Sequence, residues 1–111
     1  MPLPFQRQGF CMMTTIEIVE FRLGRGTGEA FIAANAPLNA WLKAQPGFIS
    51  RQLAEREDGG YIDIVIWSSR SDAETAAGKV MDQFGDSDAM TMIDPQSIRM
   101  SHAPVMMSLV Q

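Results

Sequence analysis

A chain of 111 residues can form one domain with a hydrophobic core, and it is small enough to gain stability by burying surface against a partner. Apolar residues make up 46% of it, which indicates a globular protein, and no apolar run approaches the roughly 20 residues that a membrane helix needs. The net charge is -4 and the Lys and Arg residues are scattered. This pattern argues against a nucleic-acid partner, because phosphate backbones are bound by clustered cations.

The first twelve residues carry no organised pattern. Prolines and polar residues interrupt them, so they lack the continuous apolar stretch of a signal peptide. We expect residues 1–12 to be a flexible extension and 13–111 to be a single domain. Cys11 is the only cysteine, which excludes an intramolecular disulfide and a thiolate metal cluster. A reducing cytoplasm is the simplest setting for such a chain.

The first strand is predicted from Thr14 to Leu23, where β-branched and aromatic residues are frequent. After a glycine-rich turn, Thr27 can cap a helix whose apolar residues recur every three or four positions. Pro37 lies inside that pattern and removes a backbone donor, so we expect the helix to be kinked or split near Asn35. Trp41 belongs to the apolar stripe of this helix.

Two strands of a hairpin follow, from Phe48 to Glu55 and from Tyr61 to Trp67. The turn Asp58-Gly59-Gly60 joins them, because glycine accepts a positive φ without steric cost. Alternation along the second strand gives two faces, neither of them polar enough to be left in water. One face carries Tyr61, Asp63, Val65 and Trp67, and the other carries Ile62, Ile64 and Ile66.

A second helix is predicted to begin at the capping box formed by Ser71 and Glu74 and to end at Gly85. A short helical turn is expected within residues 86–94, ahead of Pro95. The last strand should run from about Ser97 to Val105.

The order strand, helix, strand, strand, helix, strand predicts an α+β fold of the ferredoxin-like, split βαβ type. In this fold a four-stranded antiparallel sheet carries two helices on one face. The other face of the sheet would expose a large apolar patch on a monomer. We therefore expect a homodimer.

The helix ending in WLKAQPGF, the strand after it, the turn DGGYIDIVIWSS and the capped helix resemble the antibiotic biosynthesis monooxygenase family. The resemblance covers roughly Thr14 to Val105. It implies a dimeric α+β barrel that oxidises a phenolic or quinol substrate with molecular oxygen and uses no metal, flavin or other cofactor. Some relatives degrade haem, others act on lactones, and many have no established reaction.

In the oxygenase members of that family an Asn, a Trp four residues later and a Tyr on the next helix belong to the pocket. Trp67 matches the Trp and Asp63 stands at the Asn position, whereas the Tyr position falls near Ala73. The haem-degrading branch carries a His on the second helix. No residue from Ser71 to Phe84 is a His.

The candidate catalytic residues are Asp63 and His102. A carboxylate desolvated among apolar neighbours is a stronger base than one in water, so Asp63 can take a proton from a phenol. The alternative is a structural Asp that binds a backbone amide or an arginine, for example Arg51 or Arg99. His102 can shuttle protons near neutral pH, or it is a satisfied core or surface residue.

The candidate substrate-binding residues are aromatic: Trp67, Tyr61 and Trp41. Each can stack on a flat molecule, and each can equally be a core residue.

Three readings of the function follow from these features. One is a cofactor-independent monooxygenase acting on a small hydrophobic, aromatic molecule. Another is a dimer without catalytic activity that binds a small ligand or serves a stress-related role. An isomerase or lactone-processing enzyme of the same barrel type is a third reading, and it would consume no oxygen.

Overall fold

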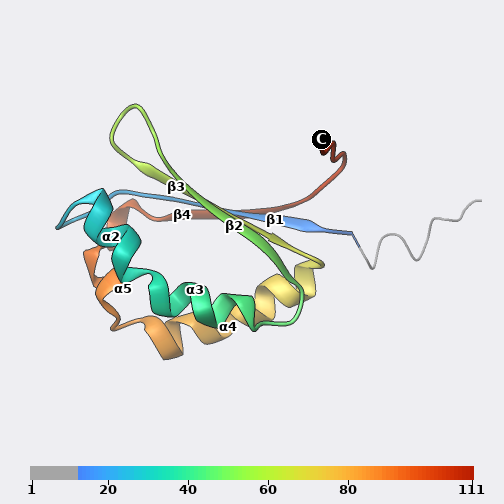
Figure 1. The fold of residues 1–111 in the computed structure, drawn as a ribbon, viewed down its shortest axis with the longest axis horizontal. Helices are drawn as coiled ribbons and strands as arrows, with labels where there is room; N and C mark the ends of the chain where they lie inside the picture. The colour runs from blue at the N-terminus through green and yellow to red at the C-terminus, as the bar shows by residue number, and fades with distance from the viewer. Residues whose placement is uncertain (1–12) are drawn as a thin grey trace, which may run out of the picture.

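The computed structural model describes residues 13–111 as one four-stranded antiparallel sheet with helices on one of its faces (Figure 1). The strands are β1 (Thr15–Phe21), β2 (Phe48–Glu55), β3 (Tyr61–Trp67) and β4 (Arg99–Pro104), in the sheet order β2-β3-β1-β4. The predicted ferredoxin-like α+β sheet is confirmed. The predicted extension at residues 1–12 lies outside the described part of the chain.

Four helices and a short turn make up the second layer. They are α2 (Gly28–Ala34), α3 (Ala36–Lys43), α4 (Arg70–Phe84), α5 (Asp88–Met92) and the 3₁₀ turn η1 (Pro95–Ser97). The pair α2 and α3 is the first predicted helix, and α5 is the short turn of helix predicted before Pro95. None of the described helices has the length and apolar character needed to cross a membrane.

The break in the first helix occurs at Asn35, as predicted. Thr27 caps α2 through its hydroxyl, which accepts a hydrogen bond from the amide of Ala30 at 3.1 Å. Asn35 ends α2 and precedes α3, so Pro37 falls in the first turn of α3, where no amide donor is needed. The proline therefore occupies a position of α3 where its missing amide breaks no bond within the helix.

The predicted start of α4 was wrong by two residues. Ser69, not Ser71, is the cap, and its hydroxyl accepts from the amide of Asp72 at 3.1 Å. Ser69 keeps the extended backbone of the preceding strand, as a helix cap requires, and the chain is already helical at Arg70. Glu74 pairs with Arg70 at 2.9 Å, one turn away, instead of returning to the cap.

The two faces of the sheet differ in what covers them. The face toward the helices buries Phe21, Val65 and Trp67, the last with only 1% of its surface exposed. The opposite face carries five partly exposed isoleucines on the two central strands, and no helix lies over it (Figure 1). We call them the outer isoleucine patch: Ile16, Ile18, Ile62, Ile64 and Ile66.

Each end of the helical layer is tied to its neighbours by backbone hydrogen bonds. At one end, the Ser68 amide donates to the Gly47 carbonyl at 2.7 Å. This bond joins the loop before β2 to the loop after β3. Gly47 has φ +81°, and a Cβ there would collide with the Asp72 carboxylate. At the other end, Leu23 forms a bridge with Ile93, and the Gly24 amide donates to the Met92 carbonyl at 2.7 Å.

Asp58 stabilises the turn between β2 and β3. The Gly60 amide donates to its Oδ1 at 2.9 Å, and this bond lowers the pKa of Asp58 from its usual 3.8. Desolvation opposes the shift, and the positive charges of Arg56 and Arg22 support it. Because the folded pKa lies below the unfolded one, the stabilisation is present above about pH 4 and is lost as the pH falls below it.

The variant Asp58→Asn should therefore show a weaker loss of stability in acid, since its amide oxygen accepts the same hydrogen bond without titrating. Thermal melts of both proteins between about pH 3 and pH 6 measure this difference. Parallel melting curves across that range would contradict the role given to the Asp58 charge.

Candidate functional site

A cavity of about 240 Å³ lies between the sheet and the helices. Most of its lining is apolar, and it includes Leu38, Trp41, Leu42, Val65, Val80 and Met90. The polar side chains in its lining are Glu17, Asn35, Arg51 and Asp63, together with the indole of Trp67. Apolar walls with a few placed polar groups are typical of small-molecule sites.

Asp63 and Arg51 form an ion pair on the floor of the cavity. Arg51 Nη2 lies 2.7 Å from Asp63 Oδ2, and Arg51 Nε lies 3.1 Å from Oδ1, so the guanidinium holds both carboxylate oxygens. Only 12% and 13% of the two side chains is exposed. Arg51 also donates from Nη1 to the side-chain oxygen of Asn39 at 2.7 Å, which links β2 to α3. This geometry agrees with the alternative interpretation of Asp63, in which it is a structural residue paired with Arg51.

Glu17 is a second buried carboxylate beside the cavity, with 7% of its surface exposed. Its Oε1 accepts from the indole N–H of Trp67 at 3.1 Å, and its Oε2 lies 3.3 Å from Nε2 of His102. The strand register explains the cluster, because Glu17 stands opposite Val65 on β3 and opposite His102 on β4. Glu17 therefore connects the cavity to the edge strand of the sheet.

The structure brings some of the predicted site residues together and separates others. Asp63, Trp67 and Trp41 all line the cavity. His102 does not line it and reaches it only through Glu17. Tyr61 lies in a different aromatic cluster, stacked on Phe21 with ring centroids 5.7 Å apart.

Two polar residues of the lining were missed as site residues in the sequence. Glu17 was read only as part of the first strand, although alternation places its side chain on the same face as Phe21, among apolar residues. Asn35 was identified as the point where the helix breaks, and its side chain was overlooked. Its Nδ2 donates to the Phe31 carbonyl at 2.8 Å, so its Oδ1 faces away from that carbonyl.

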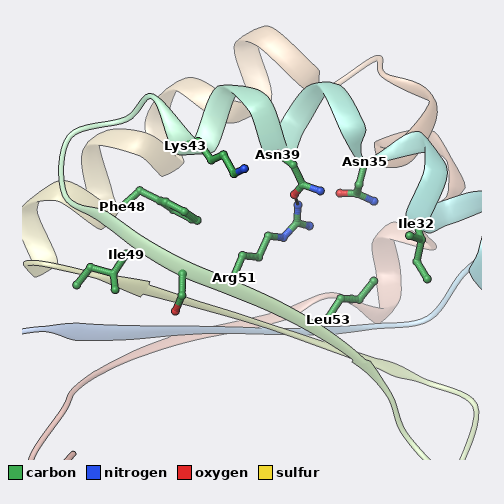
Figure 2. Close-up of a pocket in the computed structure, with 9 residues that line it drawn as sticks. Ile32, Asn35, Asn39, Lys43, Phe48, Ile49, Arg51 and Leu53 are labelled. Atoms are coloured by element: carbon green, nitrogen blue, oxygen red, sulfur yellow. Dashed lines mark hydrogen bonds between the residues drawn. The ribbon is translucent and has the colours of Figure 1, made fainter. Parts of the chain in front are cut away.

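A wider groove of about 620 Å³ opens between α2, α3 and the edge strand β2 (Figure 2). Asn35 and Arg51 line both this groove and the inner cavity. Figure 2 shows Asn39 extending from α3 to Arg51 on β2, and Lys43 lying along α3 in the space between the two elements, with Phe48 on the opposite wall. Among residues 13–111, no cluster of three or more His, Cys, Asp or Glu side chains is arranged to hold a metal ion.

No family model matches this sequence, and no curated protein matches it. Solved structures do resemble its fold. A point mutant of SnoaB from Streptomyces nogalater, a cofactor-independent oxygenase, is 16% identical with a TM-score of 0.70, over 88% of this chain and 98% of that one. MhuD from Mycobacterium tuberculosis, a haem degrader with two haems in its active site, is 17% identical with a TM-score of 0.69, over 86% and 99%.

A dimeric ferredoxin-like protein from an uncultured marine organism is 10% identical with a TM-score of 0.67, over 94% of this chain and 97% of that one. At these identities the likeness concerns the fold. The chain thus has a ferredoxin-like fold, which these three proteins share.

Proposed function

We propose that this protein is a cofactor-independent monooxygenase acting on a small aromatic molecule bound in the inner cavity. The observation that carries the proposal is the cavity itself, an apolar space walled by Trp67 and Trp41 with buried carboxylates at its edge. SnoaB, of the same fold, is a cofactor-independent oxygenase.

The chemistry requires a base that ionises the substrate. We assign this step to Glu17, because Asp63 is ion-paired with the permanently charged guanidinium of Arg51. Glu17 instead contacts the neutral indole of Trp67 and His102, which can take the proton onward. The proton would pass from Glu17 to His102 on the edge strand β4, and His102 would release it to solvent. The ionised substrate then supplies electrons to molecular oxygen. For an anthrone, one O₂ is consumed and the products are the anthraquinone and one water.

A ligand-binding dimer without catalytic activity is the second candidate. It is favoured by Ala73, which is fully buried at the position where the resemblance places the oxygenases' Tyr, and by the pairing of Asp63 with Arg51. Such a protein would bind aromatic molecules in the same cavity and consume no oxygen.

Oxygen uptake separates the two functions. With anthrone or a dihydroxynaphthalene, the purified protein should consume oxygen faster than buffer alone, and Glu17→Gln should lower that rate about 100-fold, the size of a lost general base. Glu29→Gln, at an exposed helix position, is the matched control and should leave the rate unchanged. Binding of these compounds with no oxygen uptake and no chemical change in the compounds would establish the second candidate instead.

We further propose that the working form is a homodimer in which two outer isoleucine patches meet. The apolar tail beyond β4 supports this, since Met106, Met107, Leu109 and Val110 are more than 80% exposed. Burying on the order of 800 Å² per subunit would be ordinary for such an interface.

A further inference from the structure

Asn35 Oδ1 is the one buried side-chain oxygen or nitrogen of residues 13–111 without a hydrogen-bond partner. Asn35 is only 4% exposed, and its amide orientation is set by the bond from Nδ2 to the Phe31 carbonyl. An unpaired buried acceptor costs about 1–3 kcal/mol, so its retention calls for an explanation. Asn35 lines both the inner cavity and the groove, where a bound molecule could supply the donor.

The groove carries positive charge although the chain as a whole is acidic. Lys43 and Arg51 line it, and its lining contains no carboxylate. Arg51 is neutralised by Asp63, whereas Lys43 forms no ion pair with any residue of the described chain. The groove therefore favours an anionic group near Lys43.

The polar residues that α2 and α3 contribute to the groove form one row along this helical segment. Asn35, Asn39 and Lys43 recur every four positions, so their side chains extend from one face of the helical segment into the space between it and β2 (Figure 2). Asn35 and Lys43 are separated by eight positions, which is about 12 Å along a helix. The inner cavity alone is smaller than the roughly 300–1,000 Å³ of usual ligand sites, so a larger ligand must extend into the groove.

We propose that the groove and the inner cavity form one binding site for a fused-ring aromatic acid that carries a hydroxyl at the end opposite its carboxylate. The hydroxyl donates to Asn35 Oδ1 and the carboxylate pairs with Lys43 at the mouth. The end of the aromatic body that bears the hydroxyl reaches the inner cavity beside Leu38. The rest packs in the groove on Phe48, Leu53 and Ile32, of which Ile32 is 62% exposed. This rests on the proposed function for the aromatic character of the ligand, but it concerns binding and not turnover.

The test measures dissociation constants by calorimetry without oxygen, so that no ligand is consumed. The probes are 6-hydroxy-2-naphthoate, 2-naphthoate without the hydroxyl, and 2-naphthol without the carboxylate. In the unmodified protein, 2-naphthoate should bind about tenfold more weakly than the hydroxy acid, the size of one buried hydrogen bond. Loss of the carboxylate should cost about three- to fivefold, and this difference should shrink in high salt.

Substitutions then assign each effect to a residue. Asn35→Leu should abolish the preference for the hydroxyl, and Lys43→Gln should abolish the preference for the carboxylate. Lys79→Gln removes the same charge from an exposed position on α4 and should change neither. If Asn35→Leu does not fold, the three probes on the unmodified protein and on Lys43→Gln still decide the matter.

Equal affinity for all three probes, the same affinities in Lys43→Gln and Lys79→Gln, or no binding at millimolar concentration would overturn the proposal. These outcomes are independent of oxygen uptake. Binding with the expected preferences but without oxygen consumption would refute the oxygenase and keep this site. Oxygen consumption without these binding preferences would refute the proposed binding site and keep the oxygenase.

Discussion

Asp63→Asn should lower the free energy of unfolding by about 3 kcal/mol, because it leaves the guanidinium of Arg51 buried without its counter-charge. Both side chains of the pair are about seven-eighths buried, and both carboxylate oxygens are engaged. Chemical denaturation of the variant and of the unmodified protein measures the difference.

Two controls distinguish the lost pair from general damage. The double variant Arg51→Met with Asp63→Leu removes both charges and should recover much of the lost stability. Glu74→Gln breaks the exposed pair with Arg70 and should cost less than about 0.5 kcal/mol. If Asp63→Asn is as stable as the unmodified protein, the pair does not anchor β2 to β3, and Asp63 returns as a candidate base.

Ile64→Glu should convert the proposed homodimer into a monomer. Ile64 lies at the middle of β3 on the outer face, opposite Ile18 on β1, so a carboxylate there would be buried in the dimer interface without a partner. We expect the dissociation constant to rise by at least 100-fold, measured by sedimentation at several protein concentrations.

Thr75→Glu adds the same charge on α4, in the layer on the other side of the sheet, and should leave the dimer intact. A monomer mass for the unmodified protein at all concentrations up to about 100 µM would refute the dimer, since stable interfaces of standard size persist well below that level.

Local signals in the sequence were sufficient for the hairpin and for the broken helix. The bounds of β2 and β3 match the prediction because strand alternation and the Asp-Gly turn act over a few residues. The cap of α4 was misplaced because two serines stand two positions apart, and the end of β3 decides which of them is extended. The position of the cap therefore depends on where β3 stops pairing in the sheet, and a short stretch of sequence does not show that position.

The site was predicted in part, for a similar reason. Alternation placed Asp63 and Trp67 on the same face of β3, and the structure shows that this face lies toward the helices. The same rule grouped Tyr61 with them, yet six residues of strand place Tyr61 about 20 Å from Trp67. Glu17 could not be assigned because its partners lie 50 and 85 positions away in the chain. Contacts at such separations are set by the order of the strands.

The ties at both ends of the helical layer bear on how a ligand would enter and leave. Opening that layer like a lid would break the bond from Ser68 to Gly47 at one end or the bridge between Leu23 and Ile93 at the other. The gap beside the edge strand β2 needs no such rupture, because only side chains, among them the Arg51 to Asn39 contact, cross it. Ligand exchange by this lateral route would require side-chain rotation but no loop or domain motion.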